Sequence, residues 1–252
     1  DTAESYRTSE GRIGKAVRGR RHELIIATKL SGNHSPEHIT SAIENSLKAL
    51  GTDYIDLYQL HSPQPQWPID QTMEHLLSHR DAGRIKYIGL SNYSAIQTKE
   101  AIRHGPVHSS QPQYSMLFRN VEDTILPFCV TNGIGVMAYS VLGQGLLSGK
   151  YRPGHVFPKD DSRRSHHFFQ GETFKRTSLV IDKLKKWAAD HGRDIVQLGI
   201  AWVLANPAVT SAIVGARSPK QVIHNVKAVN WKLTEYDLKE LDEIQGNLRL
   251  HF

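Results

Sequence analysis

The 252-residue sequence contains one cysteine, Cys129, and no long apolar segment. A single cysteine cannot form a disulfide within the chain, so we expect a reducing compartment, with the cytoplasm as the default. No apolar run approaches the roughly 18 residues that a membrane-spanning helix needs, which argues against a membrane partner. Apolar residues make up 39% of the chain and charged residues 22%, a balance that permits a sizeable core.

Patterns that would indicate nucleic acid, metal or ATP binding are lacking as well. The net charge is +6, but apart from Arg18–Arg21 the basic residues are scattered and form no stripe interleaved with aromatics. The glycine-rich segment Gly143–Tyr151 has Tyr151 where a phosphate loop requires Ser or Thr. Two histidine pairs have no carboxylate or cysteine cluster to complete a metal site. We expect no nucleic-acid partner and no metal, and the basic excess suits an anionic small ligand.

Short β-like runs alternate with amphipathic helical segments along the whole chain. The clearest helical pattern is capped by Ser35 and Pro36 and stops at Gly51. Further helices are predicted from about Asp70 to Gly83, over Thr177–His191 and Asp194–Asn206, and from Thr234 onward. The β-like runs are Leu24–Thr28, Ile55–Leu60, Lys86–Leu90, Val107–Gln111, Ile134–Tyr139 and Ser211–Val214.

Strand-to-strand steps of about 20 to 30 residues, each containing a helix, predict βα units and a parallel sheet. Unbroken alternation favours one (β/α)8 TIM barrel domain over residues 1–252. Six runs are visible, two short of a closed barrel, and Asp1 looks like the end of a strand that lies upstream. We therefore expect an N-terminally incomplete barrel, with a gap between the first and last visible strands. The irregular stretch Val141–Gly171 is expected at the functional, C-terminal face.

Four polar residues stand at or just after successive strand ends: Asp1, Tyr6, Lys29 and His61. Strand ends at one rim of a barrel converge on a single mouth, so these side chains are expected to meet in space. Each alone has an ordinary structural interpretation, because a lysine after a strand is commonly solvated and a histidine at a strand end is commonly structural.

The sequence around these residues resembles the motifs of the aldo-keto reductase family. The resemblance rests on Asp1-Thr2-Ala3-Glu4-Ser5-Tyr6, Ile26-Ala27-Thr28-Lys29, the strand Asp53–His61 and the segment Gly83–Tyr93. It continues in order through Gln111, Ala138-Tyr139-Ser140, Gly145–Lys150 and Ala212–Ser218. One departure is Arg7, which follows Tyr6 where the family commonly has glycine.

The resemblance implies an NADPH-dependent reductase that converts aldehydes or ketones to alcohols. Tyr6 is the implied proton donor, and Lys29 is expected to lower its pKa from the ordinary value of about 10. Asp1 would hold Lys29, and His61 would donate to the carbonyl oxygen. The hydride would come from the nicotinamide.

The resemblance also implies a binding site for NADP(H). Ser91, Asn92 and Gln111 would bind the carboxamide, and Tyr139 would stack on the nicotinamide ring. The pyrophosphate would lie against Ser140–Gly145, including Leu142 and Gly143. The adenosine end would be held by Gly215, Arg217, Ser218, Gln221 and Asn225, although Ser218 also reads as a plain helix cap.

Two other functions stay open at this point. The chain would be a regulator if it binds the nucleotide without turnover, and a Schiff-base aldolase if Lys29 attacks a carbonyl. Trp67, Phe118, Phe168 and Phe169 fall in segments expected near the mouth and suggest an apolar carbonyl substrate, but each is equally compatible with the core. The physiological substrate and the oligomeric state cannot be read from the sequence.

Overall fold

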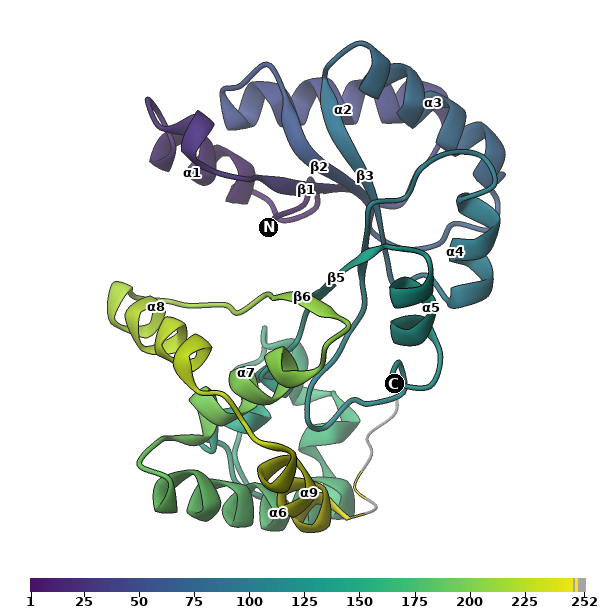
Figure 1. Cartoon of the computed structure of the whole chain (residues 1–252). Coiled ribbons are helices and arrows are strands. Elements are labelled where there is room, and N and C mark those ends of the chain that lie inside the picture. The colour runs from purple at the N-terminus through teal and green to yellow at the C-terminus, as the bar shows by residue number, and fades with distance from the viewer. Residues whose placement is uncertain (247, 249–252) are drawn as a thin grey trace. The chain divides into compact units, whose positions relative to one another are not determined.

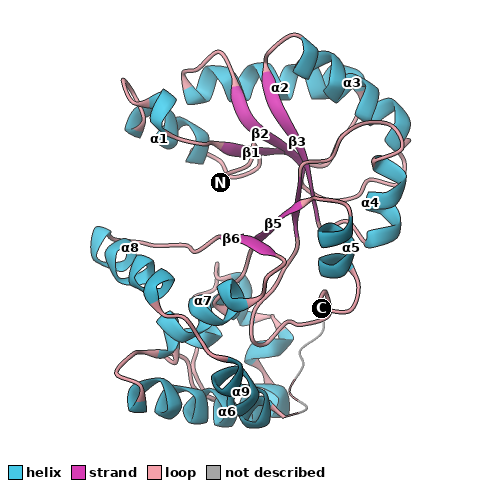
Figure 2. Cartoon of the chain, in the orientation of Figure 1, coloured by secondary structure: helices cyan, strands magenta, loops and turns pink. Residues whose placement is uncertain are grey.

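The computed structural model describes residues 1–246 and residue 248. The chain divides into two compact units, Asp1–Pro112 with Thr124–Val136, and Gln113–Asp123 with Met137–Phe252. Six strands follow one another through the sheet in chain order, from β1 to β6 (Figures 1 and 2). Wherever their register is defined, from β1 to β5, neighbouring strands are parallel. No helix of the described residues is long and apolar enough to cross a membrane.

The first unit contains the strands that position the candidate site. They are β1 (Ala27–Leu30), β2 (Ile55–Leu60), β3 (Ile85–Ser91) and β4 (Ser109–Gln111), and β5 (Gly135–Ala138) begins here. Every residue of β1, β2 and β4 is buried, as expected for a parallel sheet covered on both faces. The helices are α1 (Ser9–Ala16), α2 (Pro36–Leu50), α3 (Ile69–Asp81), α4 (Ala95–Ala101) and α5 (Ile125–Thr131), with a 3₁₀ turn, η1, at Arg21–Glu23.

Helix α2 forms as its sequence predicts. Ser35 is the N-cap, with its hydroxyl accepting from the backbone N–H of His38 at 3.2 Å, and Pro36 occupies the first turn. Gly51 ends the helix with φ of 65°, a conformation that glycine adopts without steric cost. The buried face carries Ile39, Ala42, Ile43, Ser46 and Leu50. A fully buried Ile or Leu contributes roughly 1.5–3 kcal/mol, so this face holds α2 against the sheet.

The second unit contains the rest of the elements. They are η2 (Gly143–Ser148), η3 (Ser162–Arg164), η4 (His167–Phe169), α6 (Gly171–Asp190), α7 (Ile195–Ala205), β6 (Val209–Ala212), α8 (Pro219–Val226), η5 (Lys227–Asn230) and α9 (Glu235–Gln245). Its core includes Phe118, Phe168 and Phe169, which are all at least 94% buried, since their exposed fractions are 3%, 1% and 6%. The core interpretation therefore holds for these three aromatics.

Several predicted boundaries were wrong. The first strand begins at Ala27 rather than Leu24, because the backbone N–H of Leu24 closes the 3₁₀ turn and Ile25 is 85% exposed. The last strand ends at Ala212, two residues before Val214. Helix α6 begins at Gly171, six residues before Thr177, and three short 3₁₀ helices interrupt the stretch expected to be irregular.

Candidate active site

Strand register brings the polar residues of the first unit onto one face of the sheet. Lys29 pairs with Gln59, and Gln59 pairs with Gly89. Side chains alternate between faces along a strand, so the residues two positions further on, at the strand ends, point to the same side. Ser31, His61 and Ser91 occupy those positions, and Gln111 is the register partner of Ser91 on β4.

Glycine at position 89 keeps this face open enough for the polar groups. A Cβ atom there would lie 2.2 Å from Ser109 Oγ and 2.9 Å from Gln59 Cγ, closer than atoms can approach. The absence of a side chain at Gly89 leaves room for Gln59, whose amide nitrogen donates to Asp1 Oδ1 at 3.3 Å.

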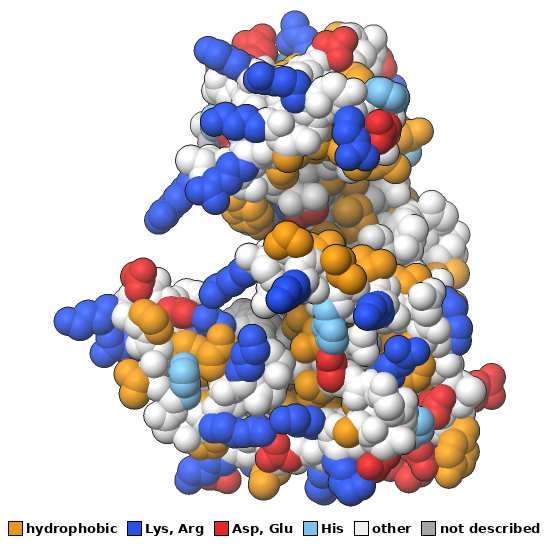
Figure 3. Space-filling view, turned by 90° about the vertical axis from the view of Figure 1, so that its left-hand side faces the viewer, with side chains coloured by type: hydrophobic (Ala, Val, Ile, Leu, Met, Phe, Trp, Pro, Cys, Tyr) orange, Lys and Arg blue, Asp and Glu red, His pale blue; other side chains and the backbone are white. Residues whose placement is uncertain are grey.

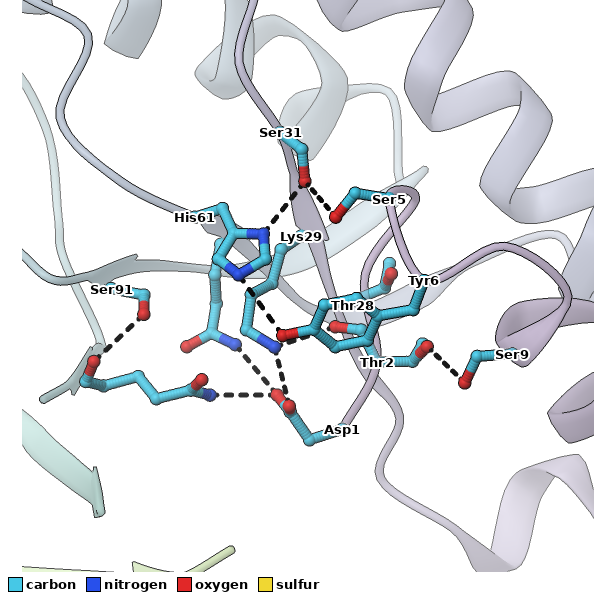
Figure 4. A network of polar contacts seen from close by, with 12 residues as sticks. Asp1, Thr2, Ser5, Tyr6, Ser9, Thr28, Lys29, Ser31, His61 and Ser91 are labelled. Atoms are coloured by element: carbon cyan, nitrogen blue, oxygen red, sulfur yellow. Dashed lines mark hydrogen bonds and ion pairs between the residues drawn. The ribbon is translucent and has the colours of Figure 1, made fainter. Parts of the chain in front are cut away.

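Lys29 is held by two oxygen atoms (Figure 4). Its Nζ donates to Asp1 Oδ2 at 2.6 Å and to the backbone carbonyl of Thr2 at 2.8 Å, and its side chain is 1% exposed. Backbone hydrogen bonds from Thr2 to Ala27 and from Glu4 to Lys29 align this segment with β1. Burial lowers the pKa of Lys29 to about 8, whereas the carboxylate beside it favours the ammonium form.

Tyr6 and His61 face each other. The hydroxyl of Tyr6 lies 3.3 Å from His61 Nε2, and the two rings meet edge to face with centroids 5.5 Å apart. Lys29 Nζ lies 5.4 Å from the centroid of the Tyr6 ring. The structure therefore brings together all four residues predicted to carry the chemistry.

The predicted direction of the Tyr6 pKa was wrong for the free protein. Burial raises the pKa of Tyr6 above its ordinary value, because it disfavours the charged tyrosinate. Burial, followed by repulsion from Lys29, lowers the pKa of His61. At neutral pH Tyr6 is a protonated phenol and His61 is a neutral imidazole, so both groups can donate a hydrogen bond.

The residues expected to bind the carboxamide adjoin these four. Gln111 Nε2 donates to Asp1 Oδ1 at 2.9 Å, and Ser91 Oγ donates to the backbone carbonyl of Gln111 at 3.0 Å. Asn92 Nδ2 donates to the carbonyl of His61 at 2.9 Å, and its φ is 63°. A hydroxyl and two carboxamides supply the mixture of donors and acceptors that a nicotinamide carboxamide requires.

In the second unit, the segment after β5 turns sharply. Ser140, Gly143, Gln144 and Gly145 all have positive φ, and a Cβ on Gly143 would lie 3.0 Å from Leu117 Cδ1. Within this turn the N–H groups of Gly143 and Gly145 donate to the carbonyls of Ser140 at 2.7 Å and of Leu142 at 3.0 Å. Tyr139 stands at its start, half-buried, with its carbonyl accepting from the N–H of Tyr114 at 3.1 Å.

The predicted adenosine residues lie at the start of α8. Ser218 is the N-cap, and its hydroxyl accepts from the N–H of Gln221 at 3.3 Å, while the Gln221 side chain accepts from the N–H of Arg217 at 2.6 Å. Ser218 therefore does cap the helix. Arg217 lines an open cavity of about 600 Å³, which Gln144 also lines. Asn225 is half-buried two turns along α8, and Gly215 is exposed.

Sequence reasoning missed Ser5, Ser31 and Gln59. Ser31 Oγ lies 2.9 Å from His61 Nδ1 and 3.0 Å from Ser5 Oγ. The spacing along the strands could have identified Ser31 and Gln59. Ser31 follows Lys29 by two residues and Gln59 precedes His61 by two, and side chains two residues apart lie on the same face of a strand.

Known proteins resemble the chain over nearly its whole length. The family model for the aldo/keto reductase family matches residues 1–245. The aldo-keto reductase YhdN of Bacillus subtilis is 36% identical over 98% of this chain and 79% of its own length. The aldo-keto reductase yakc [NADP(+)] of Schizosaccharomyces pombe is 34% identical over 91% of this chain and 72% of its own. The NADH-specific methylglyoxal reductase of Escherichia coli is 34% identical over 97% of this chain and 82% of its own length.

Solved structures give the same assignment. The glycerol dehydrogenase AKR11B4 from Gluconobacter oxydans superposes with a TM-score of 0.89 at 30% identity, covering 97% of this chain and 79% of that one. The thermostable aldo-keto reductase Tm1743 gives a TM-score of 0.80 at 33% identity, and the match covers 97% of this chain and 81% of that one. The expected α/β barrel class is confirmed. The chain belongs to the aldo/keto reductase family of nicotinamide-dependent oxidoreductases.

Proposed function

We propose that the protein reduces aldehydes or ketones to alcohols with NADPH, using Tyr6 as proton donor. The observation that carries this proposal is the cluster in which the Tyr6 hydroxyl lies 3.3 Å from His61 Nε2, next to a lysine bound to Asp1. The pairing of a neutral phenol with a neutral imidazole suits reduction, because both can donate to one carbonyl oxygen.

Each residue has one task in the proposed reaction. The nicotinamide, when bound, supplies the hydride to the carbonyl carbon. Tyr6 gives its proton to the carbonyl oxygen, and His61 Nε2–H stabilises the negative charge that develops there. The ammonium of Lys29 stabilises the tyrosinate that is left, and Asp1 keeps that ammonium charged and in place.

For the cofactor, Ser91, Asn92 and Gln111 are proposed to bind the carboxamide and Tyr139 to stack on the ring. The backbone of Ser140–Gly145 is proposed to bind the pyrophosphate. Arg217 and Ser218 are proposed to bind a 2′-phosphate, which favours NADPH over NADH, since an arginine beside a helix N-terminus suits a phosphate. The relatives differ in this respect, as one is named for NADP(+) and another for NADH.

Three observations argue against the other functions. Lys29 is 1% exposed and its ammonium is bound by two oxygens, which disfavours attack on a carbonyl as in an aldolase. The complete set of reacting groups disfavours a regulator without turnover. On the face drawn in Figure 3, Lys and Arg side chains lie among acidic and uncharged ones, which does not favour nucleic acid.

The proposal is tested by adding NADPH and a reactive aromatic aldehyde to the purified protein. We expect the absorbance of NADPH to fall at a rate proportional to protein concentration, with one alcohol formed per NADPH consumed. Cofactor binding by fluorescence titration, without turnover of several aldehydes and ketones, would favour the regulator instead.

A further inference from the structure

The hydroxyl of Ser31 lies against the ring nitrogen of His61 that faces away from Tyr6 (Figure 4). The distance from Ser31 Oγ to His61 Nδ1 is 2.9 Å. The pairing follows from the fold, because Leu30 and Leu60 are register partners at the ends of β1 and β2, and Ser31 and His61 directly follow them. Two adjacent parallel strands thus deliver these side chains to the same face.

The hydrogen on His61 has two possible positions. Because burial and the nearby Lys29 lower the pKa of His61, the ring is neutral at neutral pH, and one nitrogen carries hydrogen while the other accepts. His61 Nε2, which lies 3.3 Å from the Tyr6 hydroxyl, can donate to a carbonyl only if it carries the hydrogen. In that tautomer Nδ1 is bare and needs a donor.

A serine hydroxyl meets this need in a way that an oxygen acceptor would not. A carbonyl or carboxylate beside Nδ1 would accept its hydrogen and leave Nε2 without one. Ser31 Oγ also lies 3.0 Å from the exposed Ser5 hydroxyl, and hydroxyl hydrogens rotate, so this chain of bonds can run in either direction. When Ser5 donates to Ser31 and Ser31 donates to His61, the hydrogen is on Nε2.

We propose that Ser31 is a positioning residue, which donates its hydroxyl hydrogen to Nδ1 and holds neutral His61 in the tautomer that carries hydrogen on Nε2. Its effect on catalysis rests on the proposed function, in which His61 donates to the substrate carbonyl. In this tautomer His61 Nε2 does not accept a hydrogen bond from Tyr6, so the Tyr6 hydroxyl hydrogen is available for transfer to the substrate.

The position of Ser31 is fixed from its backbone as well. Its N–H donates to a carboxylate oxygen of Glu4, and the same oxygen lies 3.3 Å from Nε2 of His38 on α2. The segment that carries Tyr6 is therefore tied to the end of β1 through both the backbone and the side chain of Ser31. A change at Ser31 is expected to act on the orientation of His61 without altering Lys29 or Asp1.

The test compares Ser31→Ala with Ser31→Thr, which retains the hydroxyl, and with Ser78→Ala as a matched control. Ser78 is exposed on α3 and bonds the carbonyl of His75. Nitrogen-15 NMR of histidine-labelled protein reports the tautomer directly, and His61→Gln identifies the His61 signals. We expect the Nε2–H pattern in the wild-type protein and in the Thr variant, and a mixture of both tautomers in Ser31→Ala.

Kinetics provide the second measurement. We expect Ser31→Ala to lower kcat about 10-fold, less than the ~10²–10³-fold typical for complete loss of an oxyanion donor, with unchanged affinity for NADPH. Nδ1–H in the wild type, or identical spectra for wild type and Ser31→Ala, would overturn the proposal. A wild-type protein without reductase activity would refute the proposed function, and the spectra would still decide the tautomer.

Discussion

Lys29 Nζ donates to Asp1 Oδ2 across 2.6 Å although the lysine is almost entirely buried. The same carboxylate accepts from Gln111 and Gln59 through its other oxygen, so it is fixed from three sides. A buried ammonium without such a partner would lose its proton, because burial disfavours the charged form. The pair therefore keeps a positive charge beside Tyr6 below a pH of about 8.

This pair predicts an alkaline limb in the pH profile of reduction. Burial lowers the pKa of Lys29 to about 8, whereas the pKa of Tyr6 is raised, so Lys29 is the group that loses its proton first. We expect kcat to fall as the pH rises through this range. Asp1→Asn removes the charge that favours the ammonium and should move the limb to lower pH. If the alkaline limb lies at the same pH in the wild type and in Asp1→Asn, it reflects the loss of a proton from a group other than Lys29.

Arg217→Ala should separate the two cofactors. A charge-assisted hydrogen bond to a 2′-phosphate is worth roughly 1.5–3 kcal/mol, and NADH has no such phosphate. We expect the Kd for NADPH to rise about 10-fold or more and the Kd for NADH to change little. Lys220→Ala, an exposed cation in the first turn of α8, is the matched control. Equal losses for both cofactors would refute the role of Arg217.

The sequence predicted the elements that local chemistry determines. Helix α2 was predicted from its N-cap to Gly51, and β2 was predicted to the residue, because caps and a buried run mark them. The start of β1 was not predictable in this way. Leu24 and Ile25 are apolar but exposed, and the strand begins only where the chain pairs with β2.

The candidate site shows the same division. The types of residue at the strand ends pointed to Asp1, Tyr6, Lys29 and His61 as candidates, and the structure brings these four together. The contact of Ser31 with His61 depends on register between two strands, which a single sequence does not state. The raised pKa of Tyr6 depends on burial, which is set by the tertiary structure.

Asp56 is predicted to be a stability residue. Its carboxylate accepts from Arg21 at 2.6 Å, from the N–H of Ile26 at 2.9 Å and from Lys86 at 3.3 Å, and the side chain is 10% exposed. Asp56→Ala leaves Arg21 without its counter-charge and should lower the free energy of unfolding by about 3 kcal/mol. Asp81→Ala, which breaks an exposed pair with Arg80, should cost less than about 1 kcal/mol.

The stability that Asp56 confers should depend on pH. Burial opposes its ionisation, but the hydrogen bond from Ile26 and the Arg21 guanidinium outweigh burial and hold the pKa of Asp56 below its usual range. The contribution is thus complete above the unfolded pKa of about 3.9 and is lost as the pH falls through the lower folded pKa. Urea unfolding at neutral and acid pH should show the difference between wild type and Asp56→Ala shrinking in acid. A constant difference would contradict this.

Arg7, next to the proposed proton donor, has a φ of 51°. This left-handed conformation costs an L-residue with a side chain roughly 1–2 kcal/mol, and glycine adopts it without that cost. Glycine also makes the unfolded chain more flexible, which offsets part of the stabilisation. We expect Arg7→Gly to raise the free energy of unfolding by up to about 1 kcal/mol. Arg18→Gly, at an exposed position without positive φ, should not stabilise. Destabilisation by both changes alike would show that the positive φ of Arg7 carries no strain that glycine relieves.

The most direct test of the account is the Tyr6→Phe variant, which removes one hydroxyl and leaves the ring beside His61 and Lys29. A proton donor acts in the transition state and not in cofactor binding, so kcat for carbonyl reduction should fall by about 10²–10⁴-fold while the Kd for NADPH stays the same. The measurement is steady-state reduction of a reactive aldehyde together with fluorescence titration of NADPH. A variant that retains most of the wild-type kcat would contradict the assignment of Tyr6 as the acid.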